Sequence, residues 1–109
     1  MNAMAVGAIV LLLGCRADPT CSREPALDWD NFGHGFTATW CAGCHSSLLD
    51  GEDRRGAPVG VDLNDLVGVR QHADRYLARA TGDAPTMPPS GGPSDAEVAM
   101  AEEWLLCSP

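Results

Sequence analysis

The pentapeptide Cys41-Ala42-Gly43-Cys44-His45 carries the strongest chemical signal in this chain of 109 residues. It places two thiols three positions apart and an imidazole directly after the second thiol. Ala42 and Gly43 are small, so a bulky group can approach the backbone between the two thiols closely. The pattern therefore indicates a group that is held by both sulfurs and contacted by the histidine ring.

C-x-x-C-H is the pattern through which a c-type haem is attached covalently. The sulfurs of Cys41 and Cys44 would add to two vinyl groups, and His45 would become an axial ligand of the iron. Two other interpretations lack their context. A thioredoxin-like redox pair needs a βαβ unit, and no β-branched run surrounds the motif. A zinc site needs further ligands, and no second C-x-x-C or H-x3-H follows.

On these residues the chain resembles the small monohaem class I cytochromes c of bacteria. The resemblance covers about Asp28 to Cys107 and includes Thr86-Met87-Pro88-Pro89, ahead of the last expected helix. In that family a methionine in such a loop is the second axial ligand, and its soft neutral sulfur favours ferrous iron. The resemblance thus implies one covalent haem c, with its iron between His45 and Met87.

Other side chains compete for the second axial position. Met100 is expected inside the last helix, and Met87 itself could instead pack on the core as a loop methionine. His72 falls off the apolar stripe of its expected helix, which is typical of a surface residue. His34 belongs to the first helix, from which the opposite haem face is hard to reach. Met87 is therefore the predicted ligand.

The loop after His45, residues 46–61, is polar and rich in glycine. An axial histidine normally donates its other ring N–H to a fixed acceptor. By resemblance to class I cytochromes c, the carbonyl of Pro58 is the suggested acceptor. Arg54 and Arg55 also lie in this loop, and we expect a solvated charge pair rather than contacts with haem propionates.

The expected fold class is all-α, with the class I cytochrome c arrangement of three main helices and loops around one covalently bound haem. The first helix should run from about Asp28, its cap, into the haem motif. Its apolar stripe consists of Trp29, Phe32, Phe36 and Trp40. Gly33 on this stripe indicates a place where another helix crosses closely.

Two further helices are expected. The middle helix should run from Asn64 or Val69 to Thr81, with Gly82 as its stop. The segment Ser94-Asp95-Ala96-Glu97 is a capping box, which predicts the start of the last helix. The inward residues of that helix are expected to be Val98, Ala101, Trp104 and Leu105.

The chain begins with an apolar run from Ala5 to Leu13, which is too short for a membrane span of about 20 residues. Its length is typical of a signal-peptide core. The ending Leu12-Leu13-Gly14-Cys15 resembles the lipobox of bacterial lipoproteins, in which the signal is cut before a cysteine that receives lipid. An ordinary secretory signal or an uncleaved hydrophobic start is the alternative.

Together the two resemblances imply three parts: a cleaved signal over 1–14, a lipid-anchored tether over 15–27 and a cytochrome c domain over 28–109. The implied location is the bacterial cell envelope, anchored to a membrane through the lipid on Cys15 and facing the periplasm.

Cys21 and Cys107 are the cysteines that remain once lipid takes Cys15 and haem takes Cys41 and Cys44. An oxidising compartment favours a disulfide between such a pair. It would join the two ends of the domain and stabilise the fold by roughly 4–5 kcal/mol. Two buried free thiols are the alternative.

The composition gives seven arginines, no lysine and fifteen acids, a net charge of −8. An acidic surface argues against nucleic acid binding, because phosphates need a basic face. If docking is electrostatic, the redox partner in the respiratory chain or periplasm should present a positive face. The charge can equally serve solubility.

With both axial positions filled, no open site is left for a substrate. We therefore expect one-electron transfer by a carrier that is not an enzyme on its own. Two alternatives stay open. One is a haem-based ligand sensor or peroxidase-like protein with a labile sixth site. The other is a haem subunit of a larger respiratory complex.

Overall fold

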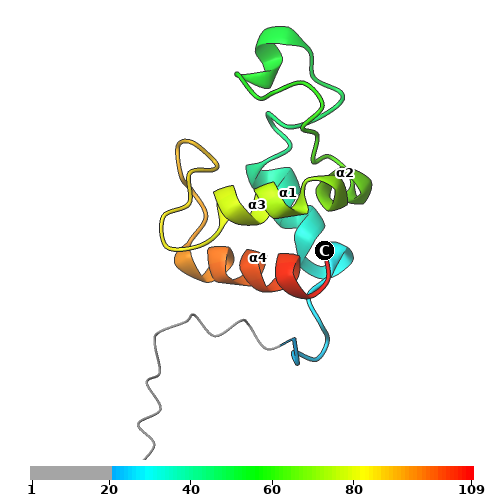
Figure 1. Ribbon diagram of the computed structural model, residues 1–109, viewed down its shortest axis with the longest axis vertical. Coiled ribbons are helices and arrows are strands. Elements are labelled where there is room, and N and C mark those ends of the chain that lie inside the picture. The colour runs from blue at the N-terminus through cyan, green and yellow to red at the C-terminus, as the bar shows by residue number, and fades with distance from the viewer. Residues whose placement is uncertain (1–20) are drawn as a thin grey trace, which may run out of the picture.

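The computed structural model describes residues 21–109, which form helices joined by loops (Figure 1). This part of the chain contains no strand, so the all-α class is confirmed for it. The signal over 1–14, the lipid site at Cys15 and the first part of the tether lie outside the described residues. The elements are η1 (Trp29–Gly33), α1 (His34–Trp40), η2 (Gly51–Arg54), α2 (Leu66–Gln71), α3 (Ala73–Ala80) and α4 (Asp95–Cys107).

The first helix begins where its sequence signal predicts. The Asp28 carboxylate accepts the N–H of Asn31 at 2.7 Å, and the Asn31 side chain accepts the N–H of Asp28 at 2.8 Å. This reciprocal pair satisfies two donors that the first turn leaves free. The chain then runs through η1 and α1 without a break and ends at Trp40, directly before the cysteine motif.

Helix α4 crosses η1 at Gly33, as the glycine on the aromatic stripe predicts. Trp104 of α4 is fully buried, and a Cβ atom at position 33 would overlap its indole ring. The ring also lies edge-on to Phe32 and Tyr76, with centroid distances of 6.2 and 5.9 Å. This crossing forms the centre of the core. Its buried apolar residues are Leu27, Phe36, Cys41, Leu63, Val69, Tyr76, Ala80, Ala101, Trp104 and Leu105.

The middle helix is divided into α2 and α3, where the sequence predicts one helix. His72 separates them, because its φ of −115° and ψ of 17° leave the helical range. Its N–H is shared between the carbonyls of Gly68 and Val69, and its ring Nε2 lies 3.0 Å from the carbonyl oxygen of Gly60. The predicted stop at Gly82 is present, since this glycine has a φ of 91°.

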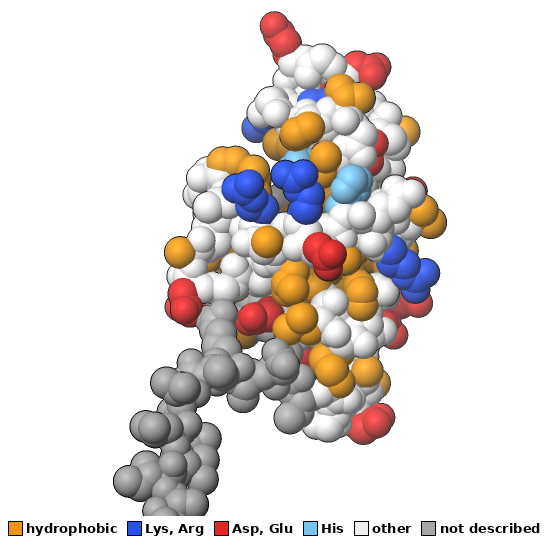
Figure 2. Space-filling model, viewed as in Figure 1, with side chains coloured by type: hydrophobic (Ala, Val, Ile, Leu, Met, Phe, Trp, Pro, Cys, Tyr) orange, Lys and Arg blue, Asp and Glu red, His pale blue; other side chains and the backbone are white. Residues whose placement is uncertain are grey.

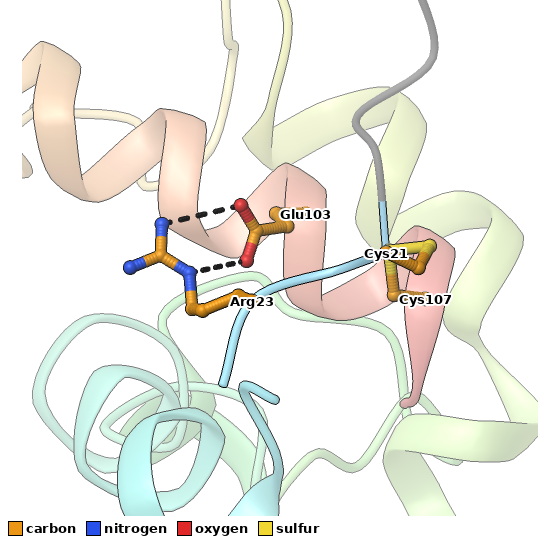
Figure 3. Close-up of a disulfide and its surroundings, with 4 residues drawn as sticks. All are labelled: Cys21, Arg23, Glu103 and Cys107. Carbon is orange, nitrogen blue, oxygen red and sulfur yellow. Dashed lines mark hydrogen bonds and ion pairs between the residues drawn. A yellow bond between two sulfur atoms is a disulfide. The ribbon is translucent and has the colours of Figure 1, made fainter. Parts of the chain in front are cut away.

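Residues 21–27 are attached to the helical body at three points, although all of them except Leu27 are exposed. The disulfide Cys21–Cys107 joins them to the end of α4, with 5.5 Å between the two Cα atoms (Figure 3). Arg23 binds the carboxylate of Glu103 through Nε at 2.7 Å and Nη2 at 3.2 Å. Leu27 is buried. The folded unit therefore includes Cys21 and begins before Asp28.

Over residues 21–109 no helix has the length and apolar character needed to cross a membrane.

Candidate functional site

The cysteine motif forms a tight turn directly after α1. The N–H groups of Cys44 and His45 donate to the carbonyl of Cys41 at 3.2 and 2.9 Å. Cys41 is buried, whereas Cys44 and His45 are partly exposed. The two cysteines are free thiols and are not joined to each other. The turn thus carries both thiols and the imidazole within five consecutive residues, with the Cys41 side chain buried.

The buried thiol of Cys41 belongs to a short polar chain inside the core. It lies 3.5 Å from the hydroxyl of Tyr76, which is 2.7 Å from the hydroxyl of Thr37. Burial raises the pKa of the Cys41 thiol, and the hydrogen bond with Tyr76 offsets part of that rise. Burial is also the main reason that the pKa of Tyr76 is raised. Both groups are therefore neutral at physiological pH.

The His45 ring is oriented by the backbone of the following loop. Its Nδ1 lies 3.0 Å from the carbonyl oxygen of Val61. A carbonyl can only accept, so Nδ1 is the donor in this bond. The structure gives Nε2 no hydrogen-bond partner among the described residues. The His45 ring is therefore oriented through Nδ1 and leaves Nε2 accessible, which is the arrangement that an axial ligand needs.

The prediction that the Pro58 carbonyl accepts the ring N–H of His45 is wrong. That carbonyl instead accepts the Nη2 group of Arg54 at 2.7 Å. Loops of different length bring different carbonyls to the ring, and every residue carries a carbonyl, so spacing alone does not identify the acceptor. The need for a carbonyl acceptor is met by Val61.

Arg54, which we expected to be solvated, is buried at 3 % exposure. Its guanidinium pairs with Asp62 at 2.8 Å and donates to several backbone carbonyls inside the loop. The expectation is wrong because the loop wraps around this side chain and supplies acceptors that replace water. Arg55 is exposed, and its φ of 50° lies in the left-handed region.

Met87 lies in the loop between α3 and α4 and is 38 % exposed. The N–H groups of Thr86 and Met87 donate to the carbonyl of Arg79 at 2.8 and 3.0 Å, which fastens the loop to the end of α3. Further along the same loop, a Cβ atom at Gly92 would overlap the ring of Trp40. The methionine loop therefore packs against the residue that precedes Cys41.

The other candidate ligands are engaged elsewhere. Met100 is partly buried and packs on the core from within α4. The ring of His72 bonds to the Gly60 carbonyl, and the exposed His34 stacks on Trp29 with a centroid distance of 4.9 Å. The choice of Met87 over these three residues stays a prediction.

The donor set fits a covalently attached haem. Among residues 21–109, no group of three or more His, Cys, Asp and Glu side chains is arranged to hold a metal ion by itself. A haem iron needs fewer protein ligands, because the macrocycle supplies the equatorial ligands and the protein adds only axial ones. The chain offers donors of these kinds in two unbridged thiols, an imidazole bonded through Nδ1 only and a partly exposed thioether.

Comparison with known proteins adds no assignment. No family model matches the chain, and the searches of curated proteins and of solved structures found no match.

Proposed function

We propose that the protein is a monohaem electron carrier of the class I cytochrome c type. In this proposal Cys41 and Cys44 hold the haem covalently, and His45 and Met87 are the axial ligands. The observation that carries the proposal is the orientation of His45, whose Nδ1 is bonded to the Val61 carbonyl while Nε2 makes no hydrogen bond with the described residues. It stands directly beside two free thiols at the spacing for haem attachment.

When bound, the haem would supply an iron that gains and loses one electron. The residues of this chain would do the rest. Thioether bonds from Cys41 and Cys44 would keep the group in place, and Val61 would hold the His45 ring in one orientation. The aromatic side chains of η1, α1 and α4 would exclude water from one side of the site. A protein of this kind has no substrate of its own, only redox partners.

The proposed location is the bacterial cell envelope, facing the periplasm, where an oxidising environment would maintain the Cys21–Cys107 disulfide. Anchoring to the membrane would depend on lipid at Cys15, after removal of residues 1–14. The resemblance of Leu12-Leu13-Gly14-Cys15 to a lipobox supports this part of the proposal.

The axial ligation tests the function directly. We expect the wild-type holoprotein to undergo one reversible one-electron transition, to show the near-infrared sulfur-to-iron band that the family resemblance implies, and to bind no carbon monoxide when reduced. Met87→Ala should lose the band and bind carbon monoxide, because the sixth position is opened. Met100→Leu is the matched control and should keep the band, since such swaps usually cost under about 1.5 kcal/mol.

The opposite outcomes point to other functions. Loss of the band in Met100→Leu and its retention in Met87→Ala would reverse the ligand assignment. Carbon monoxide binding by the reduced wild-type protein would show a labile sixth site and support a sensor or peroxidase-like protein. Stable co-purification with enzyme subunits would support a haem subunit of a larger complex.

A further inference from the structure

Arg54 is a buried cation beside the candidate site, and the proposed function gives it no role. A guanidinium has five N–H donors, and each of them has an acceptor here. Nε donates to Ala57 O at 3.2 Å, Nη1 to Ser46 O at 2.6 Å and Asp62 Oδ1 at 2.8 Å, and Nη2 to Pro58 O at 2.7 Å and Val61 O at 3.3 Å. Burying a charge costs free energy unless it is paired and bonded in this way.

Two of these acceptors belong to the backbone segments that hold His45. Ser46 is the residue directly after His45, and its carbonyl receives the shortest of the Arg54 bonds. The Val61 carbonyl receives both Arg54 Nη2 and His45 Nδ1. In addition, the N–H of Leu63 donates to the His45 carbonyl at 2.8 Å. One guanidinium therefore fastens the segment that carries His45 to the segment that orients its ring.

Sharing the Val61 carbonyl has an electronic consequence as well. A cationic donor draws electron density from the oxygen, so the oxygen accepts the His45 N–H less strongly. The ring then has less imidazolate character and donates less strongly through Nε2. The buried positive charge also disfavours the more positive oxidation state of a nearby metal. Both effects act in the same direction, and the Asp62 carboxylate, 2.8 Å from Nη1, opposes them.

We propose that Arg54 is a positioning residue for His45: it fixes the Val61 carbonyl that orients the ring, and its charge raises the reduction potential of the iron that His45 would bind. Asp62 limits this rise. The inference rests on the proposed haem-binding function.

The test compares the reduction potentials of the holoprotein and of three variants. Arg54→Gln should lower the potential, because the positive charge is lost. Asp62→Asn should raise it, because the opposing negative charge is lost while the shape is kept. Arg55→Gln removes the same charge from the neighbouring exposed position, where solvent screens it, and should change the potential little. If Arg54 and Asp62 only held the loop together, the reduction potential should fall in both Arg54→Gln and Asp62→Asn, because a loosened loop admits water to the site.

A second readout follows the His45 ring itself. In the reduced, diamagnetic protein, the Nδ1 proton should exchange with solvent about tenfold faster in Arg54→Gln and Arg54→Lys, because the backbone at Ser46 and Val61 is no longer held and opens more often. Losing about one ordinary hydrogen bond from this backbone gives that magnitude, which outweighs the stronger acceptance by the unshared Val61 carbonyl. Arg54→Lys keeps the charge but not the planar fork of donors. It should therefore lie closer to wild type in potential than Arg54→Gln does. Arg55→Gln should exchange like wild type.

The inference is overturned if Arg54→Gln and Arg55→Gln have the same potential, or if Asp62→Asn lowers it. If Arg54→Gln does not fold, Asp62→Asn and Arg54→Lys still decide the question. If the wild-type protein carries no covalent haem, both the proposed function and this inference are wrong. If haem is bound through His45 but the reduction potential does not change in these variants, only the inference is wrong.

Discussion

Gly33 is the residue at which one missing side chain allows two helices to meet. A Cβ atom there would overlap the Trp104 indole, whereas a Cβ atom at Gly35 would contact nothing within 4 Å. Gly33→Ala should therefore lower the free energy of unfolding by about 1–3 kcal/mol through overpacking. Gly35→Ala, the matched control, should be neutral or stabilising, since alanine favours a helix by up to about 1 kcal/mol. Urea denaturation of both variants measures the difference; equal effects would contradict the crossing at Gly33.

Some residues of the site could be predicted from sequence and others could not. The motif names Cys41, Cys44 and His45 because side-chain chemistry at fixed spacing is visible in the sequence. The Val61 acceptor is a backbone carbonyl, which every residue carries. The burial of Arg54 depends on how the loop folds around it, and its charge alone predicts a solvated residue.

At the scale of elements, α4 shows how local signals locate a helix. Ser94 Oγ accepts the N–H of Glu97 at 3.1 Å, and the Glu97 carboxylate accepts the N–H of Ser94 at 3.2 Å, as the capping box predicts. The same carboxylate accepts the indole N–H of Trp40 at 3.3 Å. Glu97 therefore joins the start of α4 to the end of α1, which the sequence pattern does not reveal.

This arrangement predicts a pH dependence. The hydrogen bond from the Ser94 backbone and that from Trp40 hold the pKa of Glu97 below its usual value. A depressed pKa in the folded state means that the stability from Glu97 is present above the unfolded pKa and is lost as the pH falls through the folded pKa. Wild type should thus exceed Glu97→Gln in unfolding free energy at neutral pH, and the difference should disappear in acid.

Urea denaturation at about pH 7 and about pH 3 brackets this range. Glu52→Gln, at an exposed position of η2, controls for the loss of one negative charge. A difference between wild type and Glu97→Gln that persists unchanged in acid would contradict the role of the ionised carboxylate.

The divided middle helix shows where element boundaries escape prediction. The apolar positions Val69, Tyr76 and Ala80 are buried on one side, as a continuous helix would require. The break at His72 depends on the ring reaching Gly60, twelve residues earlier in the chain. A tertiary contact of this kind is not visible in local periodicity.

At the scale of the whole molecule, the Cys21–Cys107 disulfide closes a loop across 86 positions. The double variant Cys21→Ser/Cys107→Ser should lose roughly 4 kcal/mol of unfolding free energy in the chain-entropy model. Its visible spectrum should stay native, because the bridge lies in a different part of the chain from the cysteine motif. Thermal unfolding with parallel absorption spectra tests both statements; unchanged stability would show that the bridge contributes nothing.

The net charge of −8 does not mean that the whole surface is acidic. Arginine and histidine side chains gather over α2 and α3 on one face, and acidic side chains lie both next to this group and around the edges (Figure 2). Arg75 and Arg79 of α3 are both exposed. A redox partner with a positive face would therefore have to meet an acidic part of the surface. The face drawn in Figure 2 also offers a positively charged area to a partner.

The central claim is that Cys41 and Cys44 hold haem, and the mass of one peptide tests it most directly. Trypsin should release residues 24–54, which contain the whole motif, because arginine occupies positions 23 and 54. From protein matured in a periplasm that attaches haem c, this peptide should carry one haem after acid acetone extraction. Cys41→Ser/Cys44→Ser should yield the same peptide without it. A wild-type peptide with two free thiols, or haem that acid acetone removes, would contradict the account.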